Sequence, residues 1–528
     1  MGRKLLENKT RQIILKFLPT WLPSWVVYLV LVWGFALIRM NYLWIDGDDP
    51  NLIIQAALTR NGLKPNLDFE SGYPGLSQFL QANLMHVFGV NIFSQHLYTA
   101  LLASLAGLLI CISFSRVPQW LLSLGLVLIY CQQHLVNPTP NPGHLFELFL
   151  LGIFVLINWQ EDRSSRFLFY SSFVLMGLAF LSKQYAVFIL FGYAISQFEN
   201  IEWKISDRKK YVLLMCTGIF AAVSYYLLLI PNGVLKAQAL TTLFAMVLPF
   251  IVLIWASYKS QTHKKKQKFS RAARNLTLGI TIFFLTILIG FALIYQSIEL
   301  PDVLYQVLIE APRRINDNTV LLSLSLASFK SVGAFFCFAI CTAYLVLTQY
   351  SGQINKPRVF VYQFLAIMIG ALAFTEIGNL SSTLFLILFP IIIIYVYFTK
   401  ISVVPSSRRQ FFYVMTCYQF VLIPYPNVNF HIMTFVIAFF VLVMDNYARV
   451  IPAKMGYLWA FPVLLVSLLL VHEVRTIDAM KTYTFEGVDF RSSSSSWELA
   501  IADAQNASGD IALCSTFGCE MLILVSKN

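Results

Sequence analysis

The sequence predicts an all-α polytopic membrane protein with about 15 transmembrane helices and with interfacial helices in its first outer loop. Of the 528 residues, 58% are hydrophobic and only 12% are charged, whereas a soluble domain carries about 25% charged residues. The apolar residues form long continuous runs, unlike the alternating segments of a membrane β-barrel. This composition excludes a soluble enzyme, a disordered chain and a coiled coil.

The distribution of charge predicts the orientation. Basic residues gather in alternate gaps between the apolar runs, including 259–274 and 400–409, as is typical of cytoplasmic loops. The net charge of +12 therefore reflects topology, and no nucleic-acid partner is expected. We expect a multi-pass protein of the plasma (inner) membrane, with a cytoplasmic N-terminus and an extracytoplasmic C-terminus.

The same pattern divides the chain into two parts. Residues 1–472 are expected to form the transmembrane module, which includes a first outer loop at 44–93. The composition then turns polar, and 473–528 is expected to be a short extracytoplasmic tail. Such a tail is too short to form a robust domain alone.

The start of the first outer loop carries the strongest candidates for catalysis. Asp46, Asp48 and Asp49 follow the first span, and three carboxylates there are costly unless they are solvated, protonated or paired with a cation. Asp49 precedes Pro50, which fits an N-cap and a first helical position, so capping and function both stay open for Asp49. Asp48 has no such capping role, which favours a functional one.

Two interfacial helices are expected in this loop. The first would run from Pro50 to the terminating Gly62, and the second from after Pro74 to Gly89. Leu52, Ile53, Ala56 and Ala57 form the expected apolar face of the first helix, and one side of the second carries Leu76, Phe79, Leu80, Asn83 and Val87.

Between these helices the chain reads D-F-E-S-G-Y-P-G-L from Asp68. With the preceding acidic pair, this segment resembles the first outer loop of GT-C superfamily glycosyltransferases, which include protein O-mannosyltransferases and lipid A aminoarabinose transferases. A second motif, G-L-A-F-L-S-K ending at Lys183, is similar to the family's G-L-A-x-L-T-K. The similarity covers about the first 200 residues, and beyond them only hydropathy and topology agree.

The chain departs from the family pattern at two points. Gly75 stands where many relatives have the second proline of Tyr-x-Pro-Pro-Leu. The loop 137–144 contains no acid, although relatives often carry one between the third and fourth spans.

The resemblance implies a GT-C-like fold and an enzyme that transfers a sugar on the outer face of the membrane. The implied donor is a polyprenyl-phosphate sugar, and the acceptor is a lipid, glycan or protein. Displacement would invert the anomeric centre. Asp48 is the expected base, with Asp49 as its partner, and the two carboxylates are also the possible ligands of a divalent metal ion.

The leaving lipid phosphate needs a cation. Arg313 and Arg314 are candidates, since arginine pairs well with phosphate oxygens, although balance against nearby acids is an alternative. Lys183 is a third candidate, and its alternative is a snorkelling lysine at a helix end. Substrate-binding candidates are Glu70, Tyr73 and His144.

Two other functions remain open from the sequence. A polysaccharide polymerase of the O-antigen kind is also polytopic, but it predicts long late outer loops, whereas the longest internal outer loop here is the first. A lipid or sugar transporter predicts repeated halves with interrupted helices, and no internal repeat is evident. The absence of a P-loop disfavours ATP-driven transport.

Overall fold

A computed structural model describes part of the chain, in two compact units. The first unit comprises Met1–Ile54, Phe88–Pro140 and Phe439–Asn528, and the second comprises Gln55–Val87 and Asn141–Ala438. The described residues are 21–39, 48–69, 71–114, 119–130, 140–163, 165–199, 201–202, 223, 267–296, 300–310, 460–479, 481–485 and 488–492.

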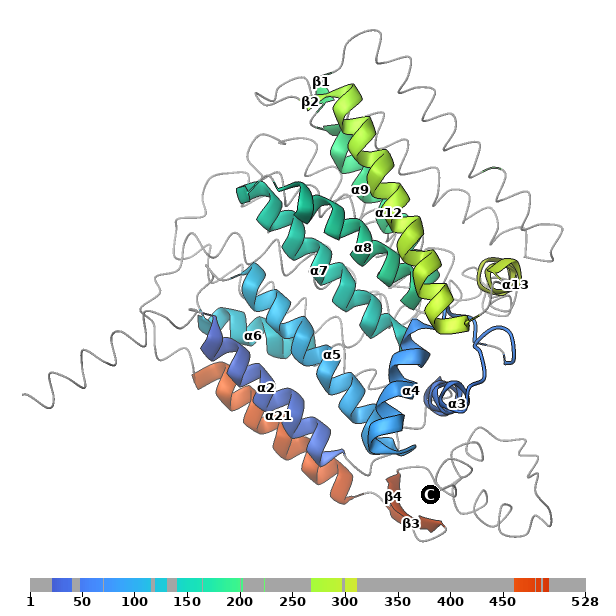
Figure 1. The fold of residues 1–528 in the computed structure, drawn as a ribbon. Helices are drawn as coiled ribbons and strands as arrows, with labels where there is room; N and C mark the ends of the chain where they lie inside the picture. The colour runs from blue at the N-terminus through green and yellow to red at the C-terminus, as the bar shows by residue number, and fades with distance from the viewer. Residues whose placement is uncertain are drawn as a thin grey trace, which may run out of the picture. The chain divides into compact units, whose positions relative to one another are not determined.

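Four described helices lie wholly in the first unit: α2 (Leu22–Ile38), α5 (Ile92–Ser113), α6 (Gln119–Tyr130) and α21 (Ala460–Asp478) (Figure 1). Helix α2 packs against each of the other three. The buried ring of Tyr28 on α2 meets the Tyr130 ring edge-on, with centroids 5.9 Å apart. Gly107 on α5 makes room for Tyr28, because a Cβ at this position would overlap its ring.

The long helices of the second unit are α7 (Pro142–Arg163), α8 (Arg166–Ser182), α9 (Val187–Glu199) and α12 (Phe269–Tyr295). Helix α8 packs between α7 and α12 (Figure 1). The seam between α8 and α12 is close because Gly279 of α12 receives the Phe173 ring and Gly290 receives Leu181. Beside α12, the strands β1 (Ile201–Glu202) and β2 (Gln267–Lys268) form a short parallel pair.

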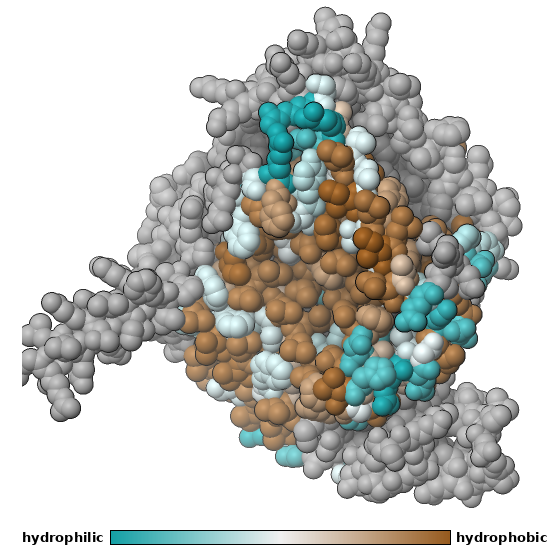
Figure 2. Space-filling model, viewed as in Figure 1, coloured by the Kyte–Doolittle hydropathy of each residue, from teal (hydrophilic) through white to brown (hydrophobic). Residues whose placement is uncertain are grey.

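Within the described residues, three helices are long and apolar enough to cross a membrane: Phe93–Ser113, Pro142–Gln160 and Ser270–Tyr295. Helix α12 also exposes large apolar side chains, and Figure 2 shows this surface as a hydrophobic band. The exposed side chains on α12 are Leu278, Phe284, Leu285, Leu288, Ile289 and Leu293. The described residues are thus mostly helical and compatible with a helical membrane protein, while many of the predicted spans lie outside them.

Two helices occupy the predicted first outer loop, α3 (Asp48–Arg60) and α4 (Leu76–Phe88). Gly62 and Gly89 follow them with φ of 89° and 83°, so both glycines end helices in the left-handed conformation as predicted. On α3, the predicted apolar face is the buried one, with Leu52, Ile53 and Ala56 inside.

Helix α4 differs from the prediction in the face that it buries. Its buried residues are Ser77, Gln78, Gln81, Ala82 and Met85, whereas Val87 is 73% exposed. The reason is local, because the amides of this helix bond inward: Gln78 Nε2 donates to Ser71 Oγ at 2.9 Å and to Gln55 Oε1 at 3.0 Å. On the predicted face, Leu76, Phe79 and Leu80 are only half-buried, and Asn83 and Val87 are exposed.

Near the C-terminus, α21 continues to Asp478, past the polar boundary predicted after residue 472. It is followed by an antiparallel hairpin of β3 (Lys481–Phe485) and β4 (Val488–Ser492). The rest of the predicted tail lies outside the described residues.

Candidate functional site

The loop between α3 and α4 is closed on itself by one asparagine. Asn66 adopts a φ of 62°, and its Nδ2 donates to the Tyr73 carbonyl at 2.6 Å. The Gly72 amide donates back to Asn66 Oδ1 at 3.1 Å. These two bonds hold residues 66–73 as a tight turn, because a side-chain amide can satisfy a backbone donor and a backbone acceptor at once.

The loop is anchored to the end of α12. The Tyr295 hydroxyl donates to the Pro74 carbonyl at 2.9 Å and accepts from Asn66 Nδ2 at 3.4 Å. A Cβ at Gly75 would lie 3.1 Å from the Tyr295 hydroxyl oxygen, and Gly75 has a φ of 98°. A proline cannot adopt this φ. This geometry therefore favours glycine at position 75.

We expect Tyr295→Phe to lower the free energy of unfolding by about 1–3 kcal/mol, because it leaves the buried Pro74 carbonyl without its donor. Thermal unfolding of the purified protein in detergent measures the effect. Tyr305→Phe is the matched control, since it removes an exposed hydroxyl that contacts Glu310 at 3.3 Å. Equal losses in the two variants would contradict an anchoring role for Tyr295.

The end of α8 meets the same loop. Lys183 caps α8, with its amide donating to the Ala179 carbonyl at 2.8 Å, and its Nζ lies 6.0 Å from the centre of the Tyr73 ring. Lys183 is only 5% exposed. A snorkelling lysine keeps its ammonium in water, so this burial argues against the snorkelling alternative for Lys183.

Gln184 joins three segments that are distant in sequence. It begins the short helix η2 (Gln184–Ala186), and its Nε2 donates to the Gly72 carbonyl at 3.1 Å and to the Val307 carbonyl at 3.3 Å. Val307 belongs to η3 (Gln306–Glu310), a π-helical turn that directly follows α13 (Leu300–Tyr305). Gln184 Oε1 is buried and has no hydrogen-bond partner among the described residues, so it can accept from a bound hydroxyl.

The start of α7 lies against Lys183. Asn141 caps this end through its Oδ1, which accepts from the Gly143 amide at 2.7 Å. The Lys183 Nζ lies 3.8 Å from the position that a Cβ on Gly143 would take. A buried ammonium at a helix N-terminus produces a positive potential that suits an oxyanion such as phosphate.

An acid that the loop pattern missed lies one turn inside α7. Glu147 is buried, and its Oε2 lies 3.9 Å from His144 Nδ1. The loop 137–144 contains no acid, and Glu147 places a carboxylate near the start of α7. Its position inside an apolar run concealed it, although a lone acid in such a run is itself a signal of function.

The candidates therefore divide into three groups. Tyr73, Lys183 and His144 lie in the second unit around the loop and the start of α7, and the sequence did not single out their neighbours Asn141, Glu147 and Gln184. Asp48 and Asp49 form the first turn of α3, in the first unit, and their side chains are not described. The candidates outside the described residues are Glu70, Arg313 and Arg314.

No protein-family model, curated protein or solved structure matches this chain. Among the described residues, no group of three or more His, Cys, Asp or Glu side chains could hold a metal ion. This statement about metal-binding groups does not cover the possible ligands Asp48 and Asp49, because their side chains are not described.

Proposed function

We propose that this chain is an integral-membrane glycosyltransferase that moves a sugar from a polyprenyl-phosphate donor to an extracytoplasmic lipid, glycan or protein. The observation that carries the proposal is the meeting of Lys183 with Tyr73. These residues come from the two motifs that resemble GT-C enzymes, and 110 positions separate them in the chain. A buried cation held against the first outer loop is what a departing lipid phosphate requires.

The chemistry assigns a role to each group of residues. The acceptor hydroxyl oxygen attacks the anomeric carbon while the bond from that carbon to the phosphate oxygen breaks. The hydroxyl proton passes to the Asp48 carboxylate, and the phosphate leaves on its lipid with the bonding electron pair. Attack opposite the leaving group inverts the anomeric centre.

Lys183, with Arg313 and Arg314, would stabilise the phosphate charge. Tyr73 lies beside Lys183, and His144 directly follows Gly143, the residue of α7 that Lys183 approaches. Gln184 Oε1 offers a buried acceptor for a sugar hydroxyl. Glu70 stays a substrate-binding candidate from the sequence. Asp49 would support Asp48, and any divalent cation would be held by these two carboxylates, whose oxygens suit Mg²⁺ or Mn²⁺.

The direct test is incubation of the purified full-length protein with radiolabelled polyprenyl-phosphate sugars and cell-envelope acceptors. Transfer of label to an acceptor, dependent on active protein and accompanied by release of polyprenyl phosphate, supports the proposal. If a broad panel of donor sugars gives no transfer, while the protein remains folded and binds none of the donors, the proposal fails.

The proposed orientation makes a separate prediction. Reporter fusions at Lys268, which precedes α12, and at Ser508, which lies outside the described residues, should report opposite sides of the membrane, with Lys268 cytoplasmic. Activity of paired cytoplasmic and periplasmic reporters measures this directly. The same side for both fusions would contradict the topology and the outer placement of the proposed site.

A further inference from the structure

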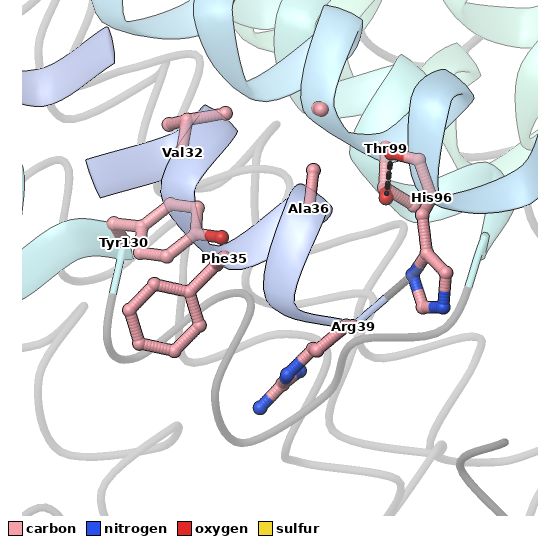
Figure 3. A pocket seen from close by; sticks show the side chains of 8 residues that line it. Val32, Phe35, Ala36, Arg39, His96, Thr99 and Tyr130 are labelled. Atoms are coloured by element: carbon pink, nitrogen blue, oxygen red, sulfur yellow. Dashed lines mark hydrogen bonds between the residues drawn. The ribbon is translucent and has the colours of Figure 1, made fainter. Parts of the chain in front are cut away.

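Among the described residues of the second unit, three arginines are exposed: Arg166 at the start of α8, and Arg271 and Arg274 near the start of α12. Within the part of the chain that the structure describes, their side chains form no hydrogen bond, ion pair or ring contact. Arg39 of the first unit differs, because it is buried and lies over the Phe35 ring in the small pocket of Figure 3. The three exposed guanidinium groups are therefore available to an anion from outside the chain.

The three arginines lie at the same level of the second unit. Helices α8 and α12 run in the same direction, because Phe173 of α8 packs on Gly279 and Leu181 packs on Gly290. Counting back seven residues from the first of these contacts reaches Arg166 on α8, and on α12 it reaches the turn that carries the other two arginines. The three residues thus form one layer at one end of the helix pair.

The two arginines of α12 do not serve the stability of that helix. The N-terminal end of a helix carries a partial positive charge, so cations in its first turns are unfavourable. Helix α12 also contains no Asp or Glu that would offset Arg271 and Arg274. Their charge is left for a partner outside the helix to neutralise.

The exposed face of α12 continues from the arginines as an apolar surface. Arg271 precedes the exposed Leu278 by seven residues, and Leu285 follows after seven more, so the three lie on one side of the helix. Figure 2 shows this side as a hydrophobic band with hydrophilic residues gathered at the end of α12 beside β1 and β2. The α12 stripe denotes the exposed apolar residues Leu278, Phe284, Leu285, Leu288, Ile289 and Leu293.

The spacing along α12 matches one leaflet of a bilayer. The apolar segment Ser270–Tyr295 has 26 residues, which gives about 39 Å of helix for a hydrocarbon layer about 30 Å thick. With the α12 stripe in hydrocarbon, Arg274 and Arg271 lie about 6 and 10 Å beyond Leu278 along the helix axis. The headgroup region begins at that edge and is about 5–7 Å deep, so the arginine side chains reach the lipid phosphates.

We infer that the arginine layer and the α12 stripe form a binding surface for an anionic phospholipid. The guanidinium groups of Arg271 and Arg274 donate to the phosphate oxygens, and the acyl chains lie along the α12 stripe. Arg166 adds positive potential at the same level. A zwitterionic lipid carries its own cation beside the phosphate and binds more weakly. The inference does not rest on the proposed transferase activity.

The test is photolabelling of the full-length protein in nanodiscs that contain equal amounts of phosphatidylglycerol and phosphatidylcholine. In each sample one of the two lipids carries a diazirine on an acyl chain, and mass spectrometry of peptides measures labelling of the α12 stripe. We expect phosphatidylglycerol to label the stripe about five- to thirtyfold more than phosphatidylcholine, since each arginine near the lipid headgroup adds about a factor of five.

A double variant, Arg271→Gln with Arg274→Gln, should lower this labelling ratio by at least about fivefold. The matched control is Arg60→Gln with Arg475→Gln, which removes two arginines from the ends of α3 and α21 and should leave the ratio unchanged. A folded Arg271→Gln, Arg274→Gln variant with the wild-type ratio overturns the inference. An equal fall in the control does so too, because it would reflect net charge rather than this surface.

Salt tests the wild-type protein and decides the matter if the double variant does not fold. Raising the ionic strength from 0.1 to 1 M shortens the screening length from about 10 to about 3 Å, so the labelling ratio should fall. A ratio that salt leaves unchanged overturns the inference. Equal labelling by the two lipids also overturns it, because α12 would then face lipid without selection. Labelling by neither lipid would mean that protein, such as a second copy of the chain, covers the stripe, and would overturn it as well.

Discussion

Replacing Asp48 by asparagine is expected to reduce sugar transfer by roughly 10²- to 10⁴-fold, because the acceptor hydroxyl loses its base. The fold should survive, since Asp48 is the first residue of α3 and asparagine keeps its size and polarity. Transfer of labelled sugar per unit time by equal amounts of folded protein measures the effect, and donor binding should stay near the wild-type level.

Asp49→Asn is the matched control for this variant. Helix α3 begins at Asp48, so Asp49 is its second residue and not the predicted N-cap. If Asp49 only helps to start the helix, asparagine should replace it with little loss, and transfer should fall far less than in Asp48→Asn. A comparable loss in both variants would give Asp49 a catalytic or ligand role. Wild-type turnover in Asp48→Asn would remove that carboxylate from the mechanism.

Replacing Lys183 by methionine should raise the apparent KM for the lipid donor by about ten- to a hundredfold. Methionine fills the space of the lysine stem, so the main loss is the buried charge that faces Tyr73 and the start of α7. A charge-assisted hydrogen bond contributes about 1.5–3 kcal/mol, which corresponds to this range. Initial rates over a series of donor concentrations measure the change.

Lys64→Met provides the comparison, because Lys64 lies in the same loop but is only partly buried. It should leave the KM for the donor unchanged. Arg313→Ala and Arg314→Ala should resemble Lys183→Met if the two arginines share the phosphate. If Lys183→Met, Arg313→Ala and Arg314→Ala all keep the wild-type KM for the donor, a metal ion or backbone donors hold the phosphate instead.

The sequence predicted best those features whose causes are local. The ends of α3 and α4 were predictable because Gly62 and Gly89 each need a positive φ to terminate a helix. The buried face of α3 followed from the spacing of its apolar residues. The same kind of spacing predicted the wrong buried face for α4. The side-chain amide of Gln78 turns inward to bond Ser71 and Gln55, and the spacing of apolar residues cannot reveal such bonds.

The site itself depends on contacts between distant segments. The two motifs were visible in the sequence, but the sequence alone does not say that Lys183 reaches Tyr73 or that Tyr295 bonds the Pro74 carbonyl. Such pairings depend on which helices pack together and in what register, and hydropathy carries no information about either. Glu147 was missed for the opposite reason, because an apolar run hid a chemically informative residue.

The double role of Gln184 has a consequence for how the site opens. One amide nitrogen serves the carbonyls of both Gly72 and Val307, so a single side-chain rotation removes one hydrogen bond from each segment at once. The first outer loop and the π-helical turn should therefore open as one cooperative unit, with matched rates of amide hydrogen exchange. A ligand hydroxyl that bonds Gln184 Oε1 would slow exchange in both segments, including the one it does not touch.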